Sequence, residues 1–234
     1  MSSIHDNLAI APLQVHAAQF PDKLALVDDR PDGTLTTWTF SQLNCEANRL
    51  AHVLRDLGAT AGDRVVWCGP NSPGVVRAMH ARAKLGYVTV PLNYRLTPDE
   101  VAYIIDNSDA TLAYVDAEYA ETFTRVRDRI PKVREIVVFG GAPPPGMLDG
   151  DSLVAVAREA ELPAPISEFT TVLYTSGTTG RPKGALRRAP DPLQVKSLLE
   201  CVGHIPDDIY ITTGPLYHSG PGGYLSFAHL LSNT

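Results

Sequence analysis

The chain has 234 residues, of which 44% are hydrophobic and 20% are charged, and its formal net charge is −6. This acidic balance argues against non-specific nucleic-acid binding, which requires a basic face. No apolar run approaches the roughly 18 residues that a membrane helix needs, and the N-terminus lacks the basic and apolar regions of a signal peptide.

The chain up to Gly58 predicts a helix, a hairpin and a second helix. Residues 9–20 have the amphipathic spacing of a helix. Residues 24–27 and 35–38 are short β-prone runs on either side of a turn-rich connection, as in a hairpin. The run Thr39-Phe40-Ser41-Gln42 matches a capping box, so the second helix begins there and ends at Gly58.

Strand and helix patterns then alternate along the chain. One expected helix is capped by Asn71 or Ser72 and closed by Gly86, the next has Pro98 in its first turn, and the last covers residues 117–129. The predicted strands are residues 64–68, 87–90, 111–115 and 135–139. Such alternation predicts an α/β fold with layered, mainly parallel sheets flanked by helices.

Residues 140–150 are the clearest change in composition, because Gly and Pro dominate them. They are expected in a linker or long surface loop, and not in a helix or sheet. A helix of about ten residues is expected to follow. We therefore predict two units: residues 1–165 form an N-terminal α/β subdomain, and residues 166–234 begin a second α/β subdomain.

The second unit opens with a β-prone run over residues 171–174, which leads into Thr175-Ser176-Gly177-Thr178-Thr179-Gly180-Arg181-Pro182-Lys183-Gly184. The glycines let the backbone approach a ligand closely, and successive N–H groups in such a turn can form a concave anion site. The hydroxyls add donors, Pro182 stiffens the loop and Lys183 supplies a full positive charge. Arg181, Arg187 and Arg188 gather beside it. The pattern favours a polyphosphate ligand.

Two other phosphate-binding loops do not fit this stretch. A Walker A loop needs Gly-x-x-x-x-Gly-Lys-Ser/Thr, and counting from Gly177 puts Pro182 where the second glycine belongs. No Gly-x-Gly-x-x-Gly fingerprint follows a predicted strand either. The spacing therefore disfavours a P-loop kinase or nucleoside triphosphatase.

Beyond the loop, residues 185–188 are expected to be extended, residues 192–203 helical and residues 208–212 a strand. The predicted strand leads into residues 214–223, a Gly/Pro-rich turn with one aromatic residue and one histidine, which suits the edge of a pocket. Taken alone, His218 would more often be a structural residue.

The three cysteines, Cys45, Cys68 and Cys201, are widely spaced, and no two of them form a Cys-x-x-Cys motif. We interpret them as reduced, buried thiols of a cytoplasmic protein, and as neither a disulfide framework nor a metal site.

The run from Tyr174 to Gly184 closely resembles the phosphate-loop signature of the adenylate-forming superfamily. This superfamily contains acyl-CoA synthetases, the adenylation domains of nonribosomal peptide synthetases, and luciferases. Pro215-Leu216-Tyr217-His218 resembles the segment that lines the carboxylate pocket in that family. Looser similarities extend the resemblance over nearly the whole chain, at residues 37–43, 62–65, 71–73 and 84–93.

The resemblance implies a two-step reaction. A carboxylate attacks the α-phosphorus of Mg-ATP to give an acyl-adenylate and pyrophosphate, and a thiol then displaces AMP. The implied small molecules are ATP, Mg²⁺, coenzyme A as co-substrate, and a carboxylic acid that is expected to be fatty or similarly hydrophobic.

The same resemblance assigns roles to individual residues. The phosphates would be cradled by Thr175, Ser176, Gly177, Thr178, Thr179 and Gly180. Lys183 would act as a catalytic point charge, and Tyr217 and His218 would shape the carboxylate site, with His218 also a catalytic candidate. No residue of this chain is expected to bind a metal directly.

The chain also departs from the family pattern. The Tyr-Gly-x-Thr-Glu segment, the Thr-Gly-Asp segment, the hinge and the mobile C-terminal domain with its lysine have no counterpart here. We therefore expect a truncated large domain: the N-terminal part of such an enzyme, weakly active or inactive alone, with apolar surface that could favour a homodimer.

Two alternatives stay open. An adenylation domain that loads a carrier protein is less favoured, because no aspartate lies beside His218 to bind an amino group. A non-catalytic nucleotide-binding or scaffolding relative would share the loop without the chemistry.

Overall fold

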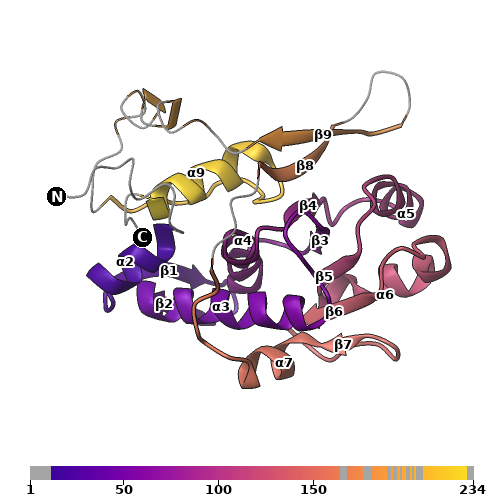
Figure 1. Ribbon diagram of the computed structural model, residues 1–234, viewed down its shortest axis with the longest axis horizontal. Coiled ribbons are helices and arrows are strands. Elements are labelled where there is room, and N and C mark those ends of the chain that lie inside the picture. The colour runs from indigo at the N-terminus through magenta and orange to yellow at the C-terminus, as the bar shows by residue number, and fades with distance from the viewer. Residues whose placement is uncertain are drawn as a thin grey trace.

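The computed structural model describes residues 12–163, 168–175, 181–188 and 208–230, together with single residues and pairs between 191 and 203. The fold is an α/β arrangement in which helices cover both faces of a central sheet (Figure 1). Within the described ranges, seven strands form this sheet in the order β7-β6-β5-β3-β4-β8-β9. The pairings that join β7, β6, β5, β3, β4 and β8 are all parallel, as predicted, and only the pair of β8 with β9 is antiparallel in this sheet.

The N-terminal elements match the predicted helix, hairpin and helix. They are α2 Pro12–Gln19, β1 Leu24–Asp29, β2 Leu35–Thr39 and α3 Phe40–Asp56. The strands β1 and β2 pair antiparallel as a separate two-stranded sheet. The capping box is present: the Thr39 side chain accepts from the Gln42 N–H, and the Gln42 side chain accepts from the Thr39 N–H. Local signals therefore fix where α3 begins.

The alternating region also follows the prediction. Its elements are β3 Arg64–Cys68, α4 Pro73–Leu85, β4 Val88–Leu92, α5 Pro98–Asn107, β5 Leu112–Asp116, α6 Ala117–Val126, the short 3₁₀ helix η1 Arg127–Arg129, and β6 Glu135–Phe139. Ser72, and not Asn71, caps α4. Gly86 ends α4 in the left-handed region with φ 76°, a conformation that glycine adopts without strain.

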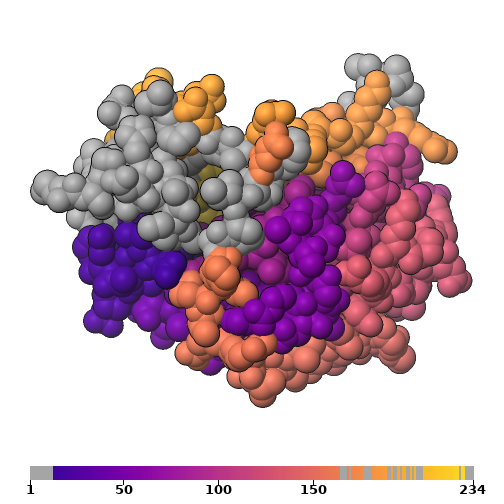
Figure 2. Space-filling model, viewed as in Figure 1, coloured from indigo at the N-terminus to yellow at the C-terminus, as the bar shows by residue number. Residues whose placement is uncertain are grey.

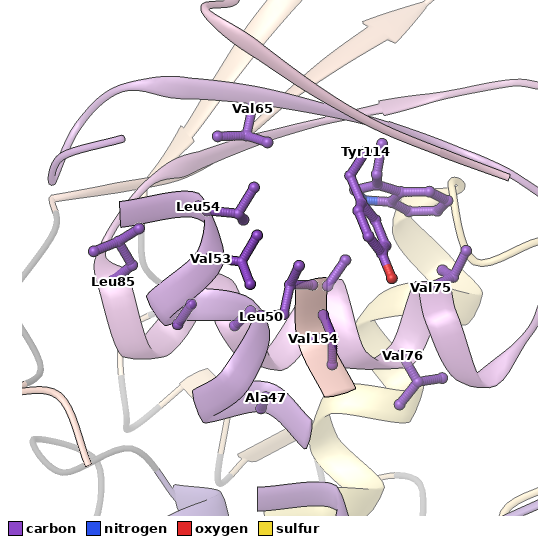
Figure 3. Close-up of a cluster of buried hydrophobic side chains, with 14 of the residues drawn as sticks. Ala47, Leu50, Val53, Leu54, Val65, Val75, Val76, Leu85, Tyr114 and Val154 are labelled. Atoms are coloured by element: carbon purple, nitrogen blue, oxygen red, sulfur yellow. The ribbon is translucent and has the colours of Figure 1, made fainter. Parts of the chain in front are cut away.

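Alternate residues of each inner strand face two separate cores. On β3, Val65 and Trp67 point to the core that α3, α4 and α7 cover, whereas Val66 and Cys68 point to the core under α5 and α6. Figure 3 shows the first core, where Leu50 and Leu54 of α3 cluster with side chains of β3, α4 and α7. This pattern is what a sheet buried on both faces requires.

The Gly/Pro-rich stretch is only partly a loop, which corrects the prediction. Leu148–Asp149 forms the short edge strand β7, and α7 begins at Gly150 and ends at Val156. β7 pairs with β6, whose free edge would otherwise be left without hydrogen-bond partners. The helix α7 has 7 residues and is shorter than expected.

A buried polar network fastens the chain that leaves α7. Lys84 on α4 is 1% exposed, and its Nζ donates to Glu161 Oε2 at 2.7 Å and to Asn44 Oδ1 at 2.6 Å. Asn48 Nδ2 donates to the other oxygen of Glu161 at 3.0 Å. The network holds the segment that approaches the predicted boundary against α3 and α4.

The strands β8 Phe169–Thr175 and β9 Lys183–Arg188 follow that boundary and form a hairpin. β8 pairs with β4, so the main sheet continues across residue 165. The expected extended run 185–188 is therefore confirmed as part of β9. The division into two subdomains stays a prediction.

Two expectations near the end of the chain are wrong. Residues 208–212 form no strand, and Ile209 and Ile211 are 77% and 76% exposed. Among the described residues, this segment takes part in no strand pair. The Gly/Pro-rich turn is also shorter than expected, because the helix α9 Ser219–Leu230 begins inside it. The predicted helix over residues 192–203 lies largely outside the described residues, and those that are described there are mostly helical.

Within the part of the chain that the structure covers, no helix is both long enough and apolar enough to cross a membrane. Of the cysteines, Cys68 is buried as expected, whereas Cys45 is half-buried and Cys201 is exposed. All three are free thiols, as predicted.

Candidate functional site

The predicted phosphate loop connects the two strands of the β8–β9 hairpin. Thr175 at the end of β8 lies opposite Lys183 at the start of β9. Both side chains are exposed, and the orange β9 residues lie on the surface of the molecule (Figure 2). The hairpin therefore brings two of the predicted site residues together, a hydroxyl and a cation. The other predicted phosphate ligands, Ser176 to Gly180, lie outside the described residues.

Helix α5 holds both flanks of this loop. Tyr103 donates its hydroxyl to the Pro182 carbonyl at 3.2 Å, and the Tyr174 hydroxyl donates to Asn107 Oδ1 at 2.8 Å. Tyr103 and Asn107 are one helical turn apart, so they present their polar groups on one face of α5. The Arg181 guanidinium lies 5.2 Å from the centre of the Tyr103 ring. Contacts with α5 therefore hold the residues on both sides of the loop in place.

Burial, together with the neighbouring Tyr103, raises the pKa of Tyr174 to about 12. The Tyr174 hydroxyl therefore stays protonated at neutral pH and can act as the donor to Asn107. The anchoring bond does not depend on pH in the physiological range.

Gly184 is needed because the Tyr174 ring lies across it. A Cβ at Gly184 would be 3.0 Å from Tyr174 Cζ and 3.1 Å from Val172 Cγ1. Tyr174 and Gly184 are also paired across the hairpin. The missing side chain lets the two strands close together directly behind Lys183.

The basic residues around the loop differ in their partners. Arg188 forms an ion pair with Glu168 at 3.0 Å, and Arg181 rests on Tyr103. No acidic side chain in the described ranges forms an ion pair with Lys183. The Lys183 side chain is exposed, and its phosphate role stays a prediction.

Tyr217 and His218 belong to the turn that precedes α9. The Tyr217 ring packs edge-on against Tyr94 at 5.7 Å, and Tyr94 in turn packs against Tyr119 at 5.1 Å. Tyr217 is half-buried, whereas the His218 side chain is exposed. The His218 backbone N–H donates to the Pro215 carbonyl at 3.0 Å, which closes the turn.

The loop and the turn lie toward the same edge of the sheet. Strands β3, β4, β5 and β8 are parallel, so their carboxyl ends share one edge. Thr175 ends β8, and Tyr94 follows β4, the strand beside β8. Open α/β sheets bind their ligands outside this edge. The arrangement suits a ligand that extends from the hairpin loop toward Tyr217.

Three contributors to the site were not predicted from the sequence. Asn71 contacts the turn before α9, and Tyr94 and Tyr103 support Tyr217 and the loop. The sequence suggested Asn71 as a helix cap and as part of a loose family similarity over residues 71–73, but gave no sign of its contact with this turn. The tyrosines carry no sequence signal that separates them from core residues, because their partners lie far away along the chain.

The described residues contain no group of three His, Cys, Asp or Glu side chains that could hold a metal ion. The donors that are placed here, a threonine hydroxyl, a lysine and backbone groups, fit phosphate oxygens and not a cation.

Comparison with known proteins agrees with this fold. The model of the AMP-binding enzyme family matches residues 13–232. The chain belongs to this family of AMP-binding enzymes.

Among curated relatives, a 3-hydroxybenzoate–CoA/4-hydroxybenzoate–CoA ligase from Thauera aromatica is 34% identical over 199 residues. That alignment covers 79% of this chain and 37% of the ligase. A feruloyl-CoA synthase from an Amycolatopsis species is 31% identical over 198 residues, which are 84% of this chain and 38% of the synthase. The chain therefore spans well under half the length of these two relatives, one of which is named a CoA ligase and the other a CoA synthase.

Among solved structures, the inhibitor-bound N-terminal domain of FACL13 from Mycobacterium tuberculosis has a TM-score of 0.79 and 27% identity. The match covers 95% of this chain and 55% of that domain. A long-chain-fatty-acid-CoA ligase from Archaeoglobus fulgidus has a TM-score of 0.84 at 22% identity, over 95% of this chain and 45% of that protein. The second match establishes the fold alone.

Proposed function

We propose that this chain is the N-terminal, phosphate-binding part of a protein that activates a carboxylic acid with ATP. The product of the first step is an acyl-adenylate with release of pyrophosphate, and in the second step coenzyme A displaces AMP to give a thioester. The observation that carries the proposal is the pairing of Thr175 with Lys183 across the hairpin, at the mouth of a loop rich in glycine and hydroxyl groups.

The chemistry of the first step explains why such a loop is useful. A carboxylate and a triphosphate are both anions, so their approach is opposed unless the protein neutralises charge. Donors and a cation that are fixed before the reaction stabilise the charge that develops on the departing pyrophosphate. We propose that Thr175 and the residues from Ser176 to Gly180 hold the phosphates while Lys183 provides the point charge. Mg²⁺ would enter with the ATP.

The acid would lie beside the turn before α9. Tyr217 presents a half-buried aromatic ring there, and His218 presents an exposed imidazole. We propose that these two residues shape the carboxylate subsite, with His218 as a further catalytic candidate. No side-chain nucleophile is required, because the substrate carboxylate attacks phosphorus directly.

Several finer points belong to the same proposal. We propose a hydrophobic acid, with fatty acids first, and coenzyme A in preference to a carrier protein as acceptor. We also propose a cytoplasmic location, weak or no adenylation by the 234-residue chain alone, and self-association through exposed apolar side chains such as Ile209 and Ile211.

The test is an acid panel scored for pyrophosphate release by a full-length protein that carries this segment, with and without coenzyme A. Fatty, aromatic and short polar acids are compared. Acid-dependent release with a preference for hydrophobic acids is expected. ATP binding without any acid-dependent release would instead indicate a non-catalytic relative, and a full rate from the 234-residue chain would contradict the proposed dependence on a further portion.

Lys183→Met tests the phosphate role directly. The expected loss in kcat/KM for ATP is about 100-fold or more, as for other preorganised charge stabilisers. Arg187→Met is the matched control, because Arg187 is an exposed cation on the same strand. Equal effects of the two variants would contradict a specific role for Lys183.

A further inference from the structure

One side chain that is far away in the sequence, Asn71, forms two hydrogen bonds to the turn that carries Tyr217 and His218. Asn71 Nδ2 donates to the Gly214 carbonyl at 2.9 Å, and Asn71 Oδ1 accepts from the Leu216 N–H at 2.8 Å. The partners are 143 and 145 residues away in the sequence. A single amide therefore pairs with two backbone groups of the turn, as a neighbouring strand would.

Asn71 is itself fixed. Arg30 Nη2 donates to the Asn71 carbonyl at 2.7 Å, and Arg30 Nε is bound to Asp28 Oδ2 at 2.7 Å. The next residue, Ser72, caps α4 by accepting from the Val75 N–H at 3.3 Å. Asn71 thus lies between the end of β3 and the start of α4, where the backbone has little freedom.

The turn is also locked from the side of α9. Leu216 is 5% exposed, and a Cβ at Gly222 would lie 2.6 Å from the Leu216 carbonyl oxygen. The first turn of α9 therefore packs directly on the backbone that Asn71 holds from the other side. Tyr217, which follows Leu216, has its ring against Tyr94 as a consequence.

We infer that Asn71 is a positioning residue for the carboxylate subsite, which it sets through the backbone that carries Tyr217 and His218. The inference rests on the proposed acid-activating function. Asn71 is not expected to touch the acid, the nucleotide or the reacting atoms. A substitution at Asn71 should therefore change the KM for the acid and not the KM for ATP, because α5, and not Asn71, anchors the phosphate loop.

The experiment compares Asn71→Ala, Asn71→Asp and Ser72→Ala. Asn71→Ala removes both hydrogen bonds, whereas Asn71→Asp keeps an acceptor for the Leu216 N–H and loses the donor to Gly214. Ser72→Ala is the matched control, because it weakens the cap of α4 one residue away and leaves the Asn71 amide in place.

Two readouts are used. The first is hydrogen exchange of the Leu216 amide in the 234-residue chain, which requires no activity. Exchange is expected to accelerate at least tenfold in Asn71→Ala and to stay near the wild-type rate in Asn71→Asp and Ser72→Ala. The second is the pair of KM values in a full-length protein that carries this segment. Asn71→Ala is expected to raise the KM for the acid about 10- to 100-fold, as misplaced contact groups do, and to leave the KM for ATP within about twofold.

The outcomes separate the inference from the proposed function. If Leu216 exchange does not change in Asn71→Ala, or if both KM values move together, the positioning role is wrong. The same holds if Ser72→Ala raises the KM for the acid as much as Asn71→Ala does. If the wild-type protein activates no acid while Asn71→Ala still accelerates exchange, the proposed function fails and the carboxylate role fails with it, although the hydrogen-bonded clamp is real.

Discussion

Acidification should loosen helix α9 through a buried pair of histidines. His80 Nε2 on α4 and His229 Nδ1 on α9 lie 2.8 Å apart, and His229 Nε2 lies 2.8 Å from the Ala25 carbonyl of β1. The Ala25 carbonyl can only accept, so the single hydrogen of neutral His229 lies on Nε2. His229 Nδ1 then carries no hydrogen and accepts from His80 Nε2. Protonation of His229 would place a donor on that nitrogen and would break this arrangement where α9 packs over α2 and β1 (Figure 1).

Burial lowers the pKa of His229 to about 4, even though the hydrogen bond with Ala25 opposes the shift, and nearby His16 lowers it further. Burial also holds the pKa of His80 well below its usual value, with added repulsion from His229, Lys84 and Arg82. Both histidines therefore resist protonation in the folded chain, and both make its stability fall as the pH falls.

The sign follows from comparing the folded and unfolded chains. An unfolded histidine takes up its proton near pH 6.5, whereas folded His229 does so only near pH 4, so the unfolded chain binds more protons between these values. The contribution of neutral His229 to stability is therefore fully present above about pH 6.5 and is lost as the pH falls toward 4. For His229 alone, the loss between pH 7 and pH 5 is about 2 kcal/mol, and His80 adds to it.

The assay is urea unfolding of the wild-type chain and His229→Gln at pH 7 and pH 5. Glutamine can hydrogen-bond in the same place and does not titrate, so the variant should lose about 2 kcal/mol less on acidification than the wild type. His218→Gln, which removes an exposed histidine, is the matched control. The reasoning is refuted if the wild type and His229→Gln lose equal stability over this range.

Three further predictions concern single side chains. Gly184→Ala places a Cβ against the Tyr174 ring and should destabilise the chain by about 1–3 kcal/mol in urea unfolding; an unchanged midpoint would contradict the tight hairpin. Lys84→Ala leaves Glu161 without its buried cation and should lower the free energy of unfolding by about 3 kcal/mol. A loss below about 1 kcal/mol would mean that this pair contributes no more than a surface salt bridge does. Tyr103→Phe removes the hydroxyl that anchors the loop and should raise the KM for ATP about fivefold in a full-length protein, with no change expected in the KM for the acid.

Much of the fold could be predicted because its signals are local. The capping box at Thr39, Pro98 in the first turn of α5 and the left-handed Gly86 depend on residues within one turn of each other, and the structure has all three where the sequence predicted them. Alternating strand and helix patterns likewise identified the parallel sheet. The loop from Thr175 to Lys183 was recognised from its composition, and the structure places its two ends opposite each other.

The errors arise where distant partners decide the outcome. Residues 208–212 look like a strand but pair with no strand in the described ranges. Leu148–Asp149 lies in a Gly/Pro-rich stretch, yet it pairs with the edge of β6. The start of α9 contains residues typical of a turn, and its packing on Leu216 makes glycine at 222 a requirement.

By itself the sequence determined most of the helices and strands, because these depend on neighbours in the chain, and for the same reason it predicted a loop that would suit an anion. Only the tertiary structure decided that β8 would pair with β4 and that Asn71 would hold a turn 143 residues away. The physical reason is that hydrogen bonds between distant segments form only once the sheet and helices have brought them together, and no local pattern records which partner a polar side chain will meet.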